Sequence, residues 1–237
     1  MKKFLLLIAA CLTASTILFS QTKTTVIPSP NRTATPPSAA KGTTTAIPKG
    51  TITGNVYTNK LLGFAIPLPD AWTIATDEFV TYMRSKGVDV SAKPPRAADL
   101  LSQKKVDDNF KRLSILATAY RSAFGSPQNS MIQIAAEDIR NLNTNRPVKD
   151  AVDYVDLMRA QLATVNMPAT YKYSETQAEK LGPNQFAYID TSDSEGKTRI
   201  YVTVRKGYAI LFSLAYDADE DLETFRDILA RANFALK

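Results

Sequence analysis

The sequence predicts an α+β fold, in which an antiparallel β-sheet of about six to eight strands is flanked by helices as an α/β/α sandwich. The first observation is a series of strand-like stretches, at 184–191, 197–205 and 208–216. Tight turns at 193–196 and 206–207 separate them, and strands joined by such turns run antiparallel. The second observation is that 148–165 and 217–232 carry apolar residues at helical spacing and would cover the sheet.

Alternation of apolar and polar residues predicts further strands earlier in the chain. One face of 110–120 would carry Leu113, Ile115, Ala117 and Ala119. After a turn at 125–127, the strand 131–137 would place Ile132, Ile134 and Ala136 on one face, and 170–176 forms another strand. Leu100 and Leu101 are expected to begin a strand that turns at 107–109 and pairs with 110–120.

Three helices are expected around this sheet. Thr76 would cap the first, which has acidic residues in its first turn and ends at Gly87. Its core-facing residues would be Phe79, Val80 and Met83. The second follows Pro147 and would bury Val148, Ala151, Val155, Met158, Leu162 and Val165. The last would bury Leu222, Phe225, Leu229 and Ala232.

The stretch 57–72 opens the folded part of the chain. Its apolar residues recur at mostly even spacing, as in a half-buried strand or short hairpin, until Pro67 and Pro69 end the ladder. Trp72, the single tryptophan, follows the turn at Pro69 and Asp70. Two interpretations remain open for it: an aromatic plug at the edge of the core, which is favoured, or a ring that stacks on a ligand.

Both ends of the folded region resemble the PsbP-like family, which also includes Mog-like proteins. The string Gly63-Phe64-Ala65-Ile66-Pro67-Leu68-Pro69-Asp70-Ala71-Trp72 is similar to the opening of PsbP-like domains. The closing strand and last helix of the family are matched by 207–213, Glu220, Asp221, 225–229 and Phe234. The resemblance implies the α+β fold and a binding or accessory role, and it carries no catalytic residue. Family members include the PsbP protein of photosystem II, Ran-binding Mog proteins and bacterial exported proteins of unknown role.

The first 21 residues are expected to be a secretory signal peptide. Two lysines precede a largely apolar run from Phe4 to Phe19, which is shorter than the ~20 residues that span a membrane. Cys11 follows a lipobox-like Ile-Ala-Ala, so lipidation at Cys11 is the alternative to simple cleavage. The protein would then be periplasmic or extracellular, or else a membrane-anchored lipoprotein. Without Cys11 the exported chain has no cysteine, which excludes disulfides and cysteine catalysis.

The chain divides into the signal 1–21, a disordered Thr/Pro-rich linker at 22–53 and one domain at 54–237. Residues 1–50 contain six basic residues and no acidic one, so 51–237 hold the remaining 23 basic residues against 23 acidic ones. A neutral domain of this kind lacks the basic footprint of a nucleic-acid-binding protein. The basic pairs 104–105 and 111–112 flank two aspartates and are interpreted as a solvated hairpin.

Few residues of the sequence suggest catalysis. There is no histidine, so serine-histidine triads and imidazole metal sites are excluded, and the nine glycines form no phosphate loop. Asp217, Asp219 and Asp221 have half the spacing of a calcium loop, but Leu222 replaces its glycine, and a helix N-cap explains them better. Asp190, Asp193 and Glu195 are interpreted as an exposed hairpin tip. We therefore expect no catalytic residue, no metal and no cofactor.

Three functions remain open from the sequence. The favoured one is an exported, non-catalytic binding or accessory module of the bacterial cell envelope that contacts an unknown protein partner. The alternatives are a carrier of a small apolar ligand and a carboxylate-based hydrolase. A filled core with an exposed apolar patch favours the first, a large pocket the second, and facing acids with raised pKa values the third. Contact with a membrane is expected only through a lipid on Cys11.

Overall fold

The computed structural model describes residues 47–122, 126, 129–140, 142, 147–194 and 196–236. The expected signal peptide with Cys11, and the expected linker up to residue 46, lie outside the described residues. So do Glu195 and most of the turn expected at 125–127.

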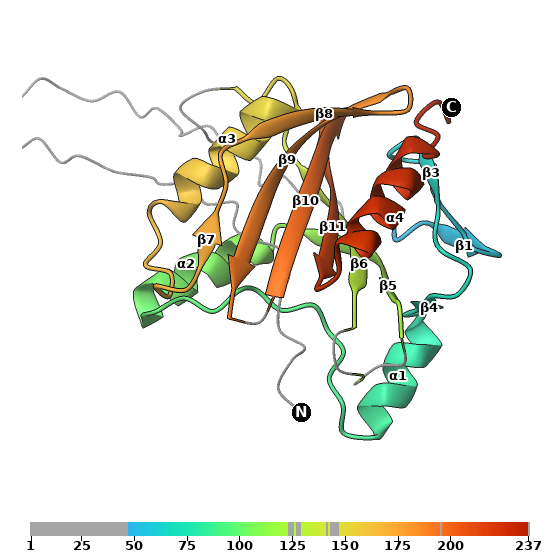
Figure 1. Ribbon diagram of the computed structural model, residues 1–237, viewed down its shortest axis with the longest axis horizontal. Helices are drawn as coiled ribbons and strands as arrows, with labels where there is room; N and C mark the ends of the chain where they lie inside the picture. The colour runs from blue at the N-terminus through green and yellow to red at the C-terminus, as the bar shows by residue number, and fades with distance from the viewer. Residues whose placement is uncertain are drawn as a thin grey trace, which may run out of the picture.

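The centre of the molecule is an eight-stranded antiparallel sheet, as the turn signals predicted (Figure 1). Its order is β4-β5-β6-β11-β10-β9-β7, and β8 also pairs with β9. The strands are β4 (Thr73–Ile74), β5 (Ser114–Tyr120), β6 (Met131–Asp138), β7 (Lys172–Tyr173), β8 (Gln177–Leu181), β9 (Asn184–Asp193), β10 (Gly196–Arg205) and β11 (Tyr208–Tyr216). β8 was not expected from the sequence. Between β10 and β11 the turn requires positive φ at Lys206 and Gly207, which have φ of 49° and 79°.

A smaller antiparallel sheet consists of β1 (Thr51–Thr53), β2 (Val56–Asn59) and β3 (Phe64–Pro67). The helices are α1 (Asp77–Ser85), α2 (Leu100–Phe110), α3 (Ala151–Leu162) and α4 (Asp219–Ala230). α3 contacts β9 and β10 on one face of the large sheet, whereas α4 contacts β11, β8 and β3 on the other (Figure 1). The fold is therefore α+β, with an antiparallel sheet between helical layers, as expected.

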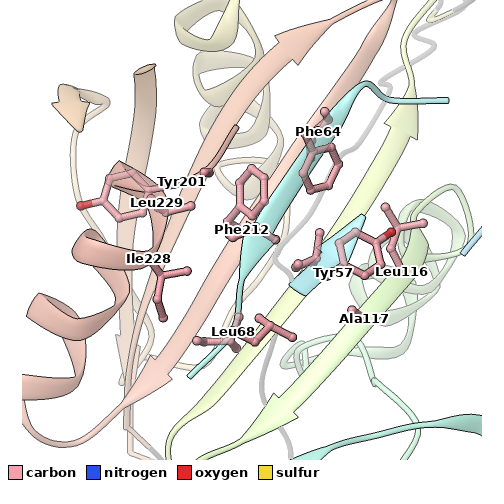
Figure 2. Close-up of a cluster of buried hydrophobic side chains, with 14 of the residues drawn as sticks. Tyr57, Phe64, Leu68, Leu116, Ala117, Tyr201, Phe212, Ile228 and Leu229 are labelled. Carbon is pink, nitrogen blue, oxygen red and sulfur yellow. The ribbon is translucent and has the colours of Figure 1, made fainter. Parts of the chain in front are cut away.

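The core consists of two clusters, one on each face of the large sheet. The cluster on the α4 side is rich in aromatic rings: Phe64 lies 5.6 Å from Phe212 edge-on and 5.6 Å from Phe234 in a stacked arrangement. Figure 2 shows Phe64 and Tyr57 of the small sheet beside Phe212, with Ile228 and Leu229 of α4 in the same cluster. On the α3 side, Val155, Met158 and Leu162 pack on aliphatic side chains of β9, β10 and β11.

The face predicted for β5 is wrong beyond its middle. Leu113 and Ile115 belong to the α3-side cluster, whereas Ala117 and Ala119 belong to the α4-side cluster. The cause is a β-bulge between Ile115 and Ala117, which shifts the register against β6 by one residue and exchanges the two faces. On β6 the prediction is confirmed, because Ile132, Ile134 and Ala136 all lie in the α4-side cluster.

The strand expected from Leu100 is a helix. Asp99 caps α2 by accepting a hydrogen bond from the Ser102 amide at 2.8 Å. Ser102, Val106 and Asn109, at helical spacing, form its buried side. Side-chain capping and this spacing outweigh the short apolar pair that suggested a strand.

Residues 47–53, expected as part of the linker before the boundary at residue 54, are attached to the domain. Ile47 is buried in the α4-side cluster, and β1 pairs with β2. The Tyr57 hydroxyl donates to the Lys49 carbonyl at 2.6 Å, and the Asn59 amide donates to the Pro48 carbonyl at 2.8 Å. Composition suggested a linker because 22–50 are rich in Thr, Pro, Ala and Ser and contain no aromatic residue, but the buried Ile47 and the pairing of β1 with β2 attach 47–53 to the domain.

The helix predicted after Thr76 is confirmed as α1, with Thr76 accepting a hydrogen bond from the Phe79 amide at 3.2 Å. Its core-facing residues are only half-buried, and Phe79 contacts Tyr120 with ring centroids 6.4 Å apart. Trp72 is also half-buried and packs against the α4-side cluster.

Candidate contact face of the sheet

One part of the large sheet carries polar and aromatic side chains where the rest carries core residues. On the α4 side of β9 and β10, Tyr188 lies opposite Tyr201, and Asp190 lies opposite Arg199. α4 packs against β11, β8 and β3, and in Figure 1 no helix crosses in front of the lower ends of β9 and β10. Asp190 belongs to the last part of β9 and Arg199 to the first part of β10. We call Tyr188, Asp190, Lys197 and Arg199 the open face; Tyr216, beside Lys197, is buried.

Arg199 is held rigidly at the centre of the open face. Its Nε and Nη2 donate to the two carboxylate oxygens of Asp190 at 2.7 Å each, which is the bidentate geometry. The guanidinium also lies 4.2 Å from the ring centroid of Tyr188, in a cation–π contact. The side chains of Arg199 and Asp190 are 15% and 38% exposed, so the pair is shielded from water but accessible at its edge.

The electrostatics of this pair keep the Arg199 guanidinium charged. Burial by itself lowers the pKa of the Arg199 guanidinium, but hydrogen bonds to Asp190 and Tyr201 outweigh it and raise that pKa above its ordinary value. Burial, and then the hydrogen bond to Glu179, raise the pKa of the Tyr201 phenol. Tyr201 therefore stays protonated and donates to Glu179 Oε2 at 2.5 Å.

A continuous network connects the open face to α4. Arg199 Nη1 lies 3.4 Å from the Tyr201 hydroxyl, and Glu179 on β8 accepts from Arg226 of α4. Arg226 also pairs with Glu223 at 2.9 Å. At the rim, Lys197 lies 5.8 Å from the Tyr216 ring centroid and 3.4 Å from Asp219. The result is a surface of tyrosines and paired charges whose side chains hold one another in place.

The sequence pattern indicates Asp190 only as part of an acidic hairpin tip, and it does not indicate Arg199 or Tyr188 as site residues. The structure uses Asp190 as the counter-ion of Arg199, and Glu195 is outside the described residues. The sequence does carry a pattern that could have indicated this face, because Lys197 and Arg199 alternate with Thr198 and Ile200, which are buried on β10. Alternation in a central strand indicates that one of its two faces is open.

The acidic group at 217–221 does not form a helix cap through its side chains. The N-cap of α4 is Ala218, without a side-chain cap hydrogen bond, while Asp219, Glu220 and Asp221 lie in the first turn. Asp221 is buried, accepts from Ser130 and pairs with Arg121 at 2.7 Å. The N-cap interpretation is therefore wrong in detail, although the acidic residues do lie at the positive end of the helix dipole. The described residues contain no group of three or more ligand-type side chains that could hold a metal ion.

Another buried carboxylate, Glu137, lies under α3 and was not anticipated. It accepts a hydrogen bond from the Tyr154 hydroxyl at 2.6 Å and lies 3.3 Å from Arg112. Arg112 therefore belongs to a buried pair, whereas Lys104 and Lys111 share the exposed carboxylate of Asp108. The hairpin expected for these basic residues is absent, because they lie on and beside α2.

The pKa values of three carboxylates outside the core, Asp89, Asp108 and Asp138, are lowered, whereas a general acid needs a raised pKa. Hydrogen bonds from Ser91 lower the pKa of Asp89 to about 2. The same direction holds for Asp138, mainly through Arg140, and for Asp108, mainly through Lys104. A hydrolase that uses a carboxylic acid as proton donor requires a raised pKa instead.

Comparisons with known proteins give structural likenesses but no match by sequence. No family model matches the chain, and no curated protein matches it. Among solved structures, it is similar to the solution structure of cyanobacterial PsbP (CyanoP) from Synechocystis sp. PCC 6803. The sequences are 14% identical, 78% of this chain and 95% of that chain are covered, and the TM-score is 0.41. That protein bears the name of the family which the motifs at 63–72 and 207–234 resemble.

In the described part of the chain, no helix combines the length and apolar character needed to cross a bilayer.

Proposed function

We propose that this protein is an exported, non-catalytic accessory module that binds a protein partner through the open face of β9 and β10. The observation that supports it best is Arg199, held by Asp190 at two 2.7 Å contacts and stacked on Tyr188. Arginine and tyrosine are among the residues enriched in binding hot spots. Side chains that are already fixed lose little conformational entropy when a partner binds.

The charge of the face favours a protein over a polyanion. Arg199 is neutralised by Asp190, and Lys197 lies beside Asp219, so the face alternates in sign. A phosphate-rich ligand would need uncompensated positive charge, and residues 51–237 hold equal numbers of basic and acidic residues, 23 each. Mixed charges around aromatic side chains suit a protein surface of complementary pattern.

The proposed export depends on the first 21 residues, with their two lysines and the apolar run from Phe4 to Phe19. Simple cleavage predicts that Cys11→Ala leaves secretion and solubility unchanged. If Cys11→Ala instead removes a membrane-bound pool, the protein is a lipoprotein. Fractionation of cells that express either full-length form distinguishes the two.

Crosslinking in cells tests the partner face. A photoreactive phenylalanine analogue replaces Tyr188 in the full chain, and in a matched control it replaces the exposed Lys60. We expect a discrete protein adduct from position 188 that is absent from position 60. Arg199→Lys keeps the charge but loses the bidentate fork and the planar stack, so it should reduce the adduct about tenfold.

The thermal midpoint of each variant provides the control for folding. Equal adducts at positions 188 and 60, or an adduct that Arg199→Lys leaves unchanged, would disprove the assignment of this face. The carrier of an apolar ligand and the carboxylate-based hydrolase remain the alternatives, and turnover of an ester or phosphoester substrate by the purified protein would overturn the non-catalytic assignment.

A further inference from the structure

Two adjacent leucines at the start of α2 are the most exposed large apolar side chains of the described chain. Leu100 and Leu101 are 88% and 78% exposed, whereas Leu61, another exposed leucine, reaches 44%. Side chains this exposed have almost no protein contact and therefore protrude from the surface. Two neighbouring leucines in water are unfavourable, which suggests that another phase or molecule covers them.

Burial and hydrogen bonds on the other side of α2 hold the two leucines in this exposed position. On the opposite side of α2, Ser102 and Val106 are buried. The Ser102 hydroxyl accepts a hydrogen bond from the Asn166 amide at 3.0 Å, and the Ala98 amide donates to the Asn166 carbonyl at 2.7 Å. These bonds tie the first turn of α2 to the segment after α3. The helix cannot roll to bury the leucines without breaking them.

Two exposed lysines lie one helical turn behind this tip, and the capping carboxylate of Asp99 lies beside Leu100. Lys104 and Lys105 follow Leu100 and Leu101 by four residues, so each lysine lies one turn behind a leucine on the same side of the helix. Both lysines are exposed, as is Arg96 in the segment before the helix. Lys104 pairs with Asp108 at 2.5 Å, but an ion pair this exposed contributes little and exchanges readily for another anion.

We propose that Leu100 and Leu101 insert into the headgroup region of an anionic membrane, with Lys104 and Lys105 contacting lipid phosphates. Leucines at the apolar edge and lysines one turn away are the arrangement of interfacial membrane helices. Two protruding side chains fall far below the ~800 Å² per partner that a stable protein interface buries. A bilayer interface accepts such a small convex tip. This site is separate from the open face of β9 and β10 and does not depend on the partner proposed there.

A fluorescent label on the tip tests the proposal in the full chain. Cys11 is the only cysteine, so Cys11→Ser with Leu101→Cys leaves one thiol for an environment-sensitive dye. The matched control is Cys11→Ser with Leu61→Cys. Because the dye reports only its own surroundings, binding of the N-terminal apolar run to vesicles does not affect the comparison.

With vesicles of equal parts phosphatidylglycerol and phosphatidylcholine, we expect a blue shift at position 101 and none at 61. Quenchers attached to the upper part of the lipid chains should quench only the label at 101. The shift should disappear with pure phosphatidylcholine and with Lys104→Gln plus Lys105→Gln, while Lys60→Gln plus Lys86→Gln leaves it intact.

Equal shifts at positions 101 and 61, or no shift with anionic vesicles, would overturn the proposal. A shift that appears without vesicles and grows with protein concentration would also overturn it, because a second copy would then cover the leucines. Thermal midpoints confirm that each labelled variant remains folded.

Discussion

Arg121 and Asp221 form an ion pair in which only one side chain reaches water. The Asp221 carboxylate is 6% exposed and the Arg121 side chain 48%, with 2.7 Å between the charged groups. Ser130 donates a second hydrogen bond to Asp221, and Arg121 and Ser130 are themselves joined through the backbone at 2.9 Å. One buried carboxylate thus fixes the start of α4 against the ends of β5 and β6.

This asymmetry predicts unequal effects of the two alanine substitutions. Arg121→Ala leaves Asp221 buried without its counter-ion and should cost about 2–4 kcal/mol. Asp221→Ala leaves an arginine that can turn into water and should cost about 1–2 kcal/mol. Urea unfolding of both variants measures the difference, with Arg84→Ala as an exposed control. If the two substitutions prove equal, or the order is reversed, Asp221 is better hydrated than its burial indicates.

Trp72 offers a second test at the level of one residue. It is half-buried and packs on the α4-side cluster, so Trp72→Ala should cost about 1–3 kcal/mol. The same substitution at the fully buried Phe212 should lower the free energy of unfolding by about 3–5 kcal/mol. Denaturant midpoints compare the two. A loss below about 0.5 kcal/mol for Trp72→Ala is typical of a surface residue and would favour the ligand-stacking role.

The N-cap of α3 should contribute to the stability of the whole domain, because this helix covers the aliphatic cluster. Asp150 accepts a hydrogen bond from the Asp153 amide at 2.9 Å and so satisfies one of the first backbone donors. Asp150→Ala should cost about 1 kcal/mol, and Asp150→Ser should restore most of it, because serine also caps. Thermal unfolding measures both. Equal losses for Ala and Ser would mean that the charge of Asp150, and not the cap, stabilises α3.

The expected and observed elements differ most where a short local signal competes with packing. α2 was expected as a strand because Leu100 and Leu101 opened it, but these two residues are its most exposed ones. The buried side of the helix uses Ser102, Val106 and Asn109, of which only one is apolar. Apolar periodicity cannot reveal a helix whose buried face is largely polar.

The contacts of residues 47–53 determine how much of the chain the domain needs. Ile47 is buried, and Lys49 and Pro48 accept hydrogen bonds from Tyr57 and Asn59. We therefore expect a chain truncated before residue 47 to keep full stability, and one truncated before residue 54 to lose at least about 2 kcal/mol. Limited proteolysis followed by N-terminal sequencing checks this. A stable fragment that starts at residue 54 would show that β1 and Ile47 are dispensable.

At the scale of the whole molecule, stability should depend little on pH near neutrality. The chain has no histidine, the side chain that ordinarily titrates between pH 5 and 8. The pKa of Asp89 is lowered from 3.8 to about 2 by Ser91, and that of Asp138 is lowered mainly by Arg140. A carboxylate whose pKa is lowered in the folded state stabilises the fold at pH values above its unfolded pKa. This contribution is lost as the pH falls through the folded pKa, so the stability of the protein should fall between about pH 4 and 2.

The alkaline limit follows from buried phenols. Burial raises the pKa of Tyr57 and of Tyr120 from 10.0 to about 12. A tyrosine whose pKa is raised in the folded state stabilises the fold at pH values below its unfolded pKa. This contribution is lost as the pH rises from about 10 to 12. Thermal midpoints from pH 2 to 12 should give a plateau between the two limits. A clear maximum or minimum between pH 5 and 8 would contradict this prediction.

The sequence by itself determined the α+β class, the strands β6 and β9 to β11, and the helices α1, α3 and α4. These are elements in which periodicity and turn signals extend over several residues and agree with one another. It also determined the absence of histidine chemistry. Only the tertiary structure decided the bulge in β5, the helix at α2, the inclusion of Ile47 and the counter-ion of Asp190. Each of these depends on which residues meet across the fold. The pairing of Arg199 with Asp190, nine positions apart on neighbouring strands, is set by the register of β9 against β10, and local composition does not encode that register.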